Sequence, residues 1–258
     1  MNRPLAALAT TALVAALAGC GSDATPAAGS SGSAASSTTL TVYAAASLKS
    51  TFTTLGGQFE TAHPGTTVTF NFAGSADLVT QLQQGAPADV FASADTNNMT
   101  KAADLVTGSP VNFATNTLEI AVPPDNPAHI TSFSDLTKSG VKLVVCAPAV
   151  PCGAAAQKIE TATKVTLKPV SEENAVTDVL TKVETGEADA GLVYVTDVKG
   201  AGGKVLGVTF PESQQAVNTY PIAALKASKN ADLAKEFTEL VTGAAGQKVL
   251  ADAGFAKP

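Results

Sequence analysis

Residues 40–55 read LTVYAAASLKSTFTTL, and this stretch decides the kind of fold that the chain adopts. Residues 40–45 are mostly apolar or β-branched, which predicts a buried strand. Leu48, Phe52 and Leu55 follow at spacings of four and three residues, which is typical of one face of a helix. Ser47 lies at the junction. The stretch therefore predicts a strand that passes directly into a helix, whose first N–H groups have no partner within the helix.

The same alternation of strand and helix continues along the chain. Further strands are predicted at 67–73, 89–94, 118–123, 142–147, 190–195, 204–210 and 219–225. Helical patterns begin near Ser75, Thr96, Gly153, Glu173, Ala231 and Ala244. This order predicts an α/β fold with one or two mostly parallel sheets, covered on both faces. Because no Gly/Pro/Ser-rich linker divides this region, two lobes would have to be joined by strands.

The composition is that of a folded protein that does not bind nucleic acid. Hydrophobic residues make up 45% of the 258 residues and charged residues 15%, so burial can offset the entropy lost on ordering. The net charge is -6, from 16 basic and 22 acidic residues, which argues against a polyanionic partner.

The N-terminus has the features of an export signal. Residues 4–18 form an uncharged run after Arg3, too short to span a bilayer comfortably and suited to a signal peptide over residues 1–19. The run ends in Leu-Ala-Gly before Cys20, which resembles the bacterial lipobox, so we expect a lipid on Cys20 and attachment to the outer face of the cell membrane. An ordinary signal peptide or an uncleaved anchor is the alternative. Residues 20–39, rich in Gly, Ala, Ser and Thr, are expected to form a flexible linker.

If Cys20 carries a lipid, Cys146 and Cys152 are left as a pair in an exported, oxidising setting, where we expect them to form a disulfide. A disulfide between them would close a short loop and contribute roughly 2 kcal/mol in the chain-entropy model. Two buried free thiols are the alternative. A zinc site would need further Cys or His ligands, which the surrounding sequence lacks.

Catalytic motifs are poorly represented in the sequence. His63 and His129 lie in proline-marked turns, and there is no G-x-S-x-G elbow, phosphate-binding glycine motif or metal-ligand spacing. We therefore expect a protein that is not an enzyme and needs no cofactor. A hydrolase with Ser47 or Ser75 as nucleophile is the alternative, and it would require a base within about 3 Å.

Four junctions between a strand and a helix instead suggest an anion site. Ser47 and Ser75 each follow a strand, and the helices near Gly153 and Glu173 begin in the same way. Unpaired N–H groups and the helix dipole favour an anion at such ends, and serine hydroxyls add donors. A plain helix cap is the alternative at each serine, and the four junctions indicate a site only if they converge.

Several segments in order resemble the molybdate-binding protein family of bacterial molybdate ABC importers. They are VYAAASL (42–48), AGSADL (73–78), GAPADVFASAD (85–95), SEENAVTDVLTKVETGEADAGLVYVTD (171–197) and the terminal GFAKP. The likeness extends from residue 40 to residue 258 and is greatest to lipid-anchored actinobacterial members.

The resemblance implies the type II periplasmic-binding-protein fold, in which two α/β lobes enclose a ligand cleft and two crossing strands join them. We expect the crossings near TLEIAV (117–122) and NTYPIA (218–223), with lobe one at 40–116 plus 219–258 and lobe two at 117–218. The family's ligand contacts fall on these residues: Ser47 and Ser75 through hydroxyl and backbone N–H, Cys152 and Val176 through backbone N–H, and Tyr194 through its hydroxyl.

The resemblance also implies a ligand and partners. We expect a monomer that binds molybdate or tungstate and delivers it to ABC permease and ATPase subunits. A binding lipoprotein for sulfate or phosphate is the main alternative. A ferric-ion site would want clustered tyrosines with carboxylate or His, and a surface lipoprotein without a ligand is the remaining possibility.

Overall fold

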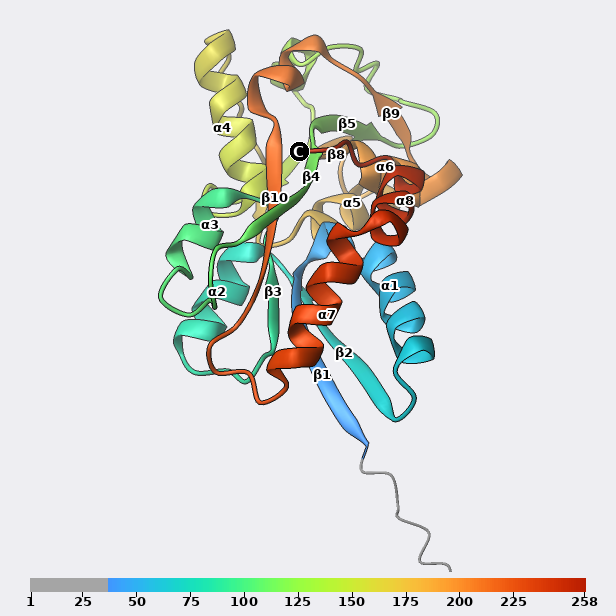
Figure 1. Ribbon diagram of the computed structural model, residues 1–258. Helices are drawn as coiled ribbons and strands as arrows, with labels where there is room; N and C mark the ends of the chain where they lie inside the picture. The colour runs from blue at the N-terminus through green and yellow to red at the C-terminus, as the bar shows by residue number, and fades with distance from the viewer. Residues whose placement is uncertain (1–36) are drawn as a thin grey trace, which may run out of the picture. The chain divides into compact units, whose positions relative to one another are not determined.

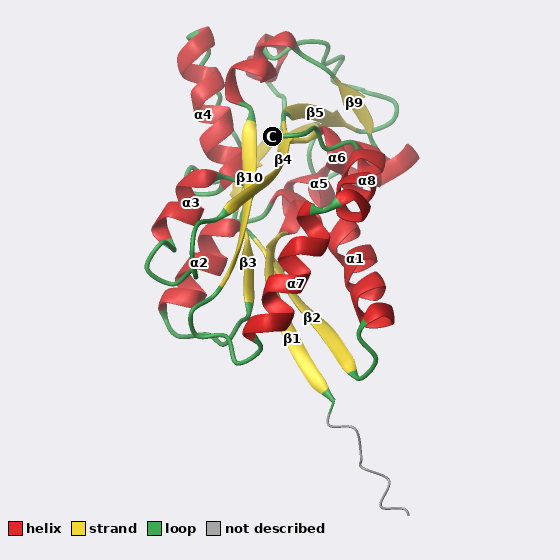
Figure 2. Cartoon of the chain, in the orientation of Figure 1, coloured by secondary structure: helices red, strands yellow, loops and turns green. Residues whose placement is uncertain are grey.

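The chain builds two separate five-stranded sheets in a computed structural model that describes residues 37–258 (Figures 1 and 2). In spatial order, the first sheet contains β2 (Thr66–Ala73), β1 (Thr38–Ala45), β3 (Val90–Ala92), β10 (Asn218–Ala224) and β4 (Val111–Asn116). The second sheet contains β7 (Ser171–Glu173), β6 (Leu143–Cys146), β8 (Ala190–Tyr194), β5 (Leu118–Val122) and β9 (Leu206–Val208).

Both sheets are mixed, with the antiparallel strands at the places where the chain changes sheet. β1 pairs in parallel with β2 and β3, whereas β10 is antiparallel to both β3 and β4. In the second sheet β6 is parallel to β7 and β8, and β5 is antiparallel to β8 and β9. Only Thr117 separates β4 from β5, so the chain enters the second sheet there and returns to the first at β10.

Helices cover both faces of the first sheet. On one face lie α1 (Lys49–Ala62), α7 (Ala231–Thr242) and α8 (Ala244–Ala253), and on the other lie α2 (Ser75–Gln83) and α3 (Thr96–Lys101) (Figure 1). The second sheet carries α4 (Pro151–Thr163), α5 (Val176–Glu184) and α6 (Val195–Ala201). Short 3-10 turns complete the fold: η1 (Ala46–Leu48), η2 (Ser134–Thr137), η3 (Gly202–Lys204) and η4 (Pro211–Ala216).

Separate hydrophobic cores hold the two sheets. Under α1 and α7, the aromatic rings of Phe52, Phe59 and Phe237 meet edge to face, with centroids 5.4 to 5.9 Å apart. Such pairs contribute beyond the area that they bury. On the opposite face of the first sheet, Leu78 of α2 and Met99 of α3 belong to a second cluster. A third cluster fills the space around the second sheet.

Apart from the 3-10 turns, two strands and one helix were not expected from the sequence. β4 pairs with β10, β7 pairs with β6, and α6 follows β8 directly. Residues 171–173 read Ser-Glu-Glu, which carries no apolar alternation, so only the parallel pairing to β6 makes them a strand. Because of that strand, α5 begins at Val176 rather than near Glu173, and the expected earlier start is wrong.

The linker that was expected to extend to residue 39 overlaps the first strand. β1 begins at Thr38, and Thr38 and Thr39 pair with Thr66 and Thr67 of β2, so these two β-branched residues belong to the sheet. The expected signal peptide, the lipid site at Cys20 and the linker up to residue 36 lie outside the described residues. Across residues 37–258, none of the helices combines the length and apolar character needed to cross a membrane.

Candidate anion-binding site

A cavity between the two sheets contains all five residues that were expected to contact a ligand. Its volume is about 10 Å³, measured as the space open to the centre of a water-sized sphere, and the cavity is partly open to solvent. The lining residues are Ala45, Ala46, Ser47, Ala73, Gly74, Ser75, Ala94, Val150, Pro151, Cys152, Val176 and Tyr194. Ser47 and Ser75 come from elements of the first sheet, and Cys152, Val176 and Tyr194 come from elements of the second. The strand-to-helix junctions therefore converge.

The two serines do not cap helices. Ser47 lies in η1, and its Oγ is 3.1 Å from the Tyr220 hydroxyl oxygen of β10. Ser75 is the first residue of α2, and its Oγ accepts a hydrogen bond from the Ala94 N–H at 3.0 Å. No cap hydrogen bond from a side chain is present at the start of η1, α1 or α2. The alternative that these serines are plain N-caps is therefore wrong, because their hydroxyls contact residues distant in the sequence.

Two residues at helix starts of the second lobe, Cys152 and Val176, also line the cavity. Cys152 is the second residue of α4, after Pro151, and Val176 is the first residue of α5. The first N–H groups of a helix have no partner within it, and the helix dipole places partial positive charge there. Pro151 contributes no N–H, which is acceptable at the first position of a helix. Two helix starts thus line the cavity in addition to the residues that carry hydroxyls.

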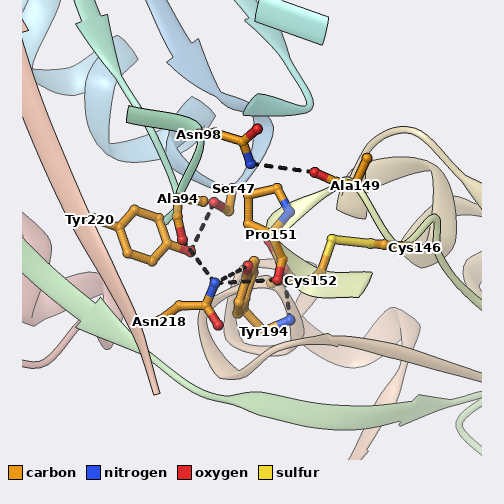
Figure 3. The surroundings of a disulfide bond; sticks show 11 residues. Ser47, Ala94, Asn98, Cys146, Ala149, Pro151, Cys152, Tyr194, Asn218 and Tyr220 are labelled. Carbon is orange, nitrogen blue, oxygen red and sulfur yellow. Dashed lines mark hydrogen bonds between the residues drawn. A yellow bond between two sulfur atoms is a disulfide. The ribbon is translucent and has the colours of Figure 1, made fainter. Parts of the chain in front are cut away.

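A disulfide braces one of these helix ends. Cys146 at the end of β6 is bonded to Cys152, with Cα atoms 5.6 Å apart, as expected from the sequence (Figure 3). Both cysteines are buried. The neighbouring Gly153 packs against the backbone of the same turn, since a Cβ there would lie 2.1 Å from the Ala147 carbonyl oxygen. The bridge and the glycine together hold the Cys152 N–H beside the end of β6.

Tyr194 presents its hydroxyl from the last residue of β8. The side chain is 1% exposed and packs edge to face on Tyr220, with ring centroids 6.0 Å apart. Its hydroxyl oxygen lies 3.1 Å from Nδ2 of Asn218, the first residue of β10 (Figure 3). Burial is the main reason why the pKa of Tyr194 is raised well above its ordinary value, with smaller contributions from Tyr220 and from nearby carboxylates. The hydroxyl therefore keeps its proton and can donate it.

Asp197 is the buried acid nearest to Tyr194. Its carboxylate accepts the backbone N–H of Tyr194 at 2.9 Å, at the start of α6. Burial raises the pKa of Asp197 to about 7, although the hydrogen bond from Tyr194 works in the opposite direction. Asp197 does not line the cavity.

The two lobes touch beside the cavity. A Cβ added to Gly74 would lie 1.9 Å from the backbone oxygen of Asn174, which stands between β7 and α5. Gly74 has φ -59° and ψ 139°, values open to any residue, so close approach rather than backbone conformation requires glycine here. Asn98 of α3 also donates to the Ala149 carbonyl oxygen at 3.4 Å.

The cavity walls carry donors but no charged side chain. Among residues 37–258, those lining the cavity include no Asp, Glu, Lys, Arg or His. His63 is instead 2.6 Å from Glu236 at the surface, and His129 lies in the loop after β5. Neither histidine is therefore placed to act as the base for a hydrolase with Ser47 or Ser75 as its nucleophile. Within the described part of the chain, no group of three or more His, Cys, Asp or Glu residues is placed to hold a metal ion.

The hydrogen-bond partners of the predicted site hydroxyls, Ala94, Asn218 and Tyr220, were not predicted from the sequence. Ala94 bonds to Ser75, and Tyr220 lies 173 residues from its partner Ser47. Asn218 and Tyr220 stand in NTYPIA, which was identified only as a crossing strand. No local pattern distinguishes their side chains from others in a strand, because their partners belong to distant segments.

Comparisons with known proteins place the chain among binding proteins. Residues 40–256 match the model of a family described as "Bacterial extracellular solute-binding protein". The molybdate-binding protein ModA of Mycobacterium tuberculosis H37Rv is 52% identical over 253 residues, which cover 97% of each chain. YvgL of Bacillus subtilis, described as an ABC transporter substrate-binding lipoprotein, is 30% identical over 84% of this chain and 85% of its own.

Solved structures agree on the fold. The periplasmic molybdate-binding protein of Azotobacter vinelandii superimposes with a TM-score of 0.72 at 22% identity, covering 85% of this chain and 99% of the other. The expectation of a periplasmic-binding-protein fold with two α/β lobes is therefore confirmed.

Proposed function

Because the chain belongs to the bacterial extracellular solute-binding protein family, which consists of binding proteins rather than enzymes, we propose that it captures molybdate for an ABC importer. The observation that carries this proposal is the cavity, where Ser47, Ser75, Cys152, Val176 and Tyr194 converge with no charged side chain among the lining residues. The relationship to mycobacterial ModA supports the choice of ligand.

Neutral donors are sufficient to hold this anion. Molybdate at neutral pH is a fully deprotonated dianion, so each of its oxygens accepts hydrogen bonds. About seven donors come from the five residues, and a hydrogen bond to a charged group contributes roughly 1.5 to 3 kcal/mol. Against the cost of association and ordering, a Kd at or below roughly 1 µM, about -8 kcal/mol, is within reach.

The same walls disfavour a protonated oxyanion. Monohydrogen phosphate brings an O–H that needs an acceptor, and a buried donor left unpaired costs roughly 1 to 3 kcal/mol. Sulfate lacks such a proton, so discrimination against it has to come from the size of the cavity. Tungstate has the same charge and shape as molybdate and should bind about as well.

Transport would follow from closure of the two lobes. Ligand bound to donors from both lobes stabilises the arrangement in which the donors converge, and so shifts the population toward it. The closed monomer would then deliver its ligand to the permease, and ATPase subunits would supply the energy. The description of YvgL as an ABC transporter substrate-binding lipoprotein supports these partners.

We further propose that the protein is anchored by a lipid on Cys20, with a signal peptide over residues 1–19. The Leu-Ala-Gly-Cys sequence at 17–20 and the extracellular family support this. Mass spectrometry of the protein extracted from membranes would detect a diacylated Cys20 as the new N-terminus. Release of the Cys20→Ser variant into the medium would agree, and an unmodified Cys20 in the membrane-bound protein would contradict the anchor.

Isothermal titration tests the choice of ligand. The folded protein is titrated in turn with molybdate, tungstate, sulfate and phosphate at neutral pH. We expect tight binding of the first two and at least about 100-fold weaker binding of the other two. Sulfate binding as tight as molybdate would overturn the proposal and favour a sulfate-binding protein. If no oxyanion binds or raises the melting temperature at large excess, the protein does not bind oxyanions.

A further inference from the structure

We infer that Asn218 is a positioning residue that holds the Tyr194 hydroxyl as a donor toward the cavity, so that the site selects anions carrying no proton. This inference rests on the proposed function and extends it, because it assigns the selectivity to a residue that does not line the cavity. Asn218 stands at the start of β10, where the chain returns to the first sheet.

The surroundings of Asn218 determine which end of its amide faces Tyr194. The same end of the side chain lies 2.9 Å from the Ala94 carbonyl oxygen and 3.4 Å from the Pro151 carbonyl oxygen (Figure 3). Carbonyl oxygens only accept hydrogen bonds, so this end is the NH₂ group rather than the amide oxygen. The Tyr194 oxygen, 3.1 Å away, therefore faces a pure donor and has to accept from it.

That contact fixes the direction of the Tyr194 proton. A phenol has one proton, and because its oxygen accepts from Asn218, the proton points to another acceptor. Two acceptors are available: an anion in the cavity, or the oxygen of Tyr220, whose ring packs on that of Tyr194. The Tyr220 oxygen is itself 3.1 Å from Ser47, so the second route also ends at a cavity hydroxyl.

The Ala94 peptide group has a similar effect on the Ser75 hydroxyl in the first lobe. Its N–H donates to Ser75 Oγ at 3.0 Å, so the proton of Ser75 is free to point to an anion in the cavity that Ser75 lines. Its carbonyl oxygen accepts from Asn218 at 2.9 Å. Asn218 is 6% exposed and Ser75 is 1% exposed, so these contacts are shielded from competing water. One peptide and one amide thus set the hydroxyls of both lobes as donors.

The consequence for the ligand is selection by protonation state. A fully deprotonated anion, whose oxygens all accept hydrogen bonds, meets hydroxyl groups whose protons already point toward it. The hydroxyl groups therefore need not reorient when the anion binds. A monoprotonated anion brings an O–H into a cavity whose hydroxyl protons point toward the ligand, so its own proton meets donors instead of acceptors. Selectivity against phosphate should therefore depend on Asn218.

The test is a double-mutant cycle between Asn218 and Tyr194, measured by titration with sodium molybdate and with phosphate at neutral pH. Asn218→Leu removes the amide donor at similar size. Asn218→Asp places an acceptor there, to which Tyr194 would turn its proton. Each variant is made in the wild-type chain and in the Tyr194→Phe background. Thermal melting identifies the variants that fold. The double-mutant cycle can be completed with either Asn218→Leu or Asn218→Asp.

We expect Asn218→Leu to weaken molybdate binding by about 10-fold and Asn218→Asp by about 100-fold. In the Tyr194→Phe background, Asn218→Leu should change the affinity by less than about 3-fold, because there is no phenol proton left to direct. Asn218→Asp should also lower the ratio of molybdate to phosphate affinity, an effect that a merely structural role would not produce.

Equal losses in both backgrounds would overturn the inference, since Asn218 would then act independently of Tyr194. Unchanged molybdate affinity in a folded Asn218 variant would also overturn it. Failure of the wild-type protein to bind molybdate is a different result, since it overturns the proposed function on which the inference rests.

Discussion

Substitution of Ser75 by alanine tests the site most directly, because the hydroxyl has both a structural and a proposed ligand contact. Ser75 Oγ accepts the Ala94 N–H at 3.0 Å, and the side chain is 1% exposed. Ser75→Ala removes a hydrogen bond to the anion, which should weaken binding by about 1.5 to 3 kcal/mol, or about 10- to 150-fold in Kd.

The same substitution should also lower stability. It leaves the Ala94 N–H without its acceptor, at a cost of about 1 to 3 kcal/mol. For a protein of this size the Tm falls by about 2 to 4 °C per kcal/mol. A residue that only capped a helix would show the stability loss with unchanged affinity.

Calorimetric titration with molybdate and thermal melting without ligand measure the two effects separately. Ser50→Ala is the matched control, because Ser50 is exposed on α1 and outside the cavity, and neither quantity should fall. Unchanged molybdate affinity in a folded Ser75→Ala protein would refute the assignment of this hydroxyl as a ligand. An unchanged Tm would refute the structural contact with Ala94.

Three further outcomes are expected. Gly74→Ala should weaken molybdate binding at least about 10-fold in titrations, because the new Cβ would lie 1.9 Å from the backbone oxygen of Asn174 and keep the lobes apart. The control variant Gly57→Ala, whose Cβ lies in open space on α1, should bind molybdate as the wild type does. Equal affinities of the two variants would contradict the contact at Gly74. Reduction of the Cys146–Cys152 bridge should lower the free energy of unfolding by about 2 kcal/mol and weaken molybdate binding. Thermal melting with and without molybdate measures both effects. A reduced protein with unchanged molybdate affinity would show that the bridge does not position the start of α4. The pKa of Asp197 is about 7 in the folded state and about 3.9 in the unfolded state, so the folded state binds more protons between these pH values and stability should fall as pH rises from about 4 to 7. Denaturant midpoints at pH 5 and pH 8 should show this loss of stability in the wild type and a smaller loss in Asp197→Asn. Equal losses in the two proteins would contradict the assignment to Asp197.

Much of the local structure follows from the sequence. The strand at 40–45 and the amphipathic spacing of Leu48, Phe52 and Leu55 correspond to β1 and to η1 with α1, because burial of one face imposes a period on the residues. The convergence of Ser47 and Ser75 with the second-lobe residues was expected from a family resemblance rather than from periodicity. β7 was missed, because its Ser-Glu-Glu residues form a strand only through pairing with β6.

The sequence by itself determined most of the strands and helices, including the strand-to-helix junctions at Ser47 and Ser75. Only the tertiary structure decided what the side chains at these junctions contact. Ser47 meets Tyr220 across 173 residues of sequence, and Asn218 bonds to both Ala94 and Tyr194. Hydrophobic periodicity and helix-start patterns extend over a few residues, whereas the direction of a hydroxyl proton depends on a neighbour that only the folding of both lobes brings near. The stretch at 40–55 therefore places the Ser47 hydroxyl at a helix start, and the returning strand β10 brings the Tyr220 hydroxyl that it contacts.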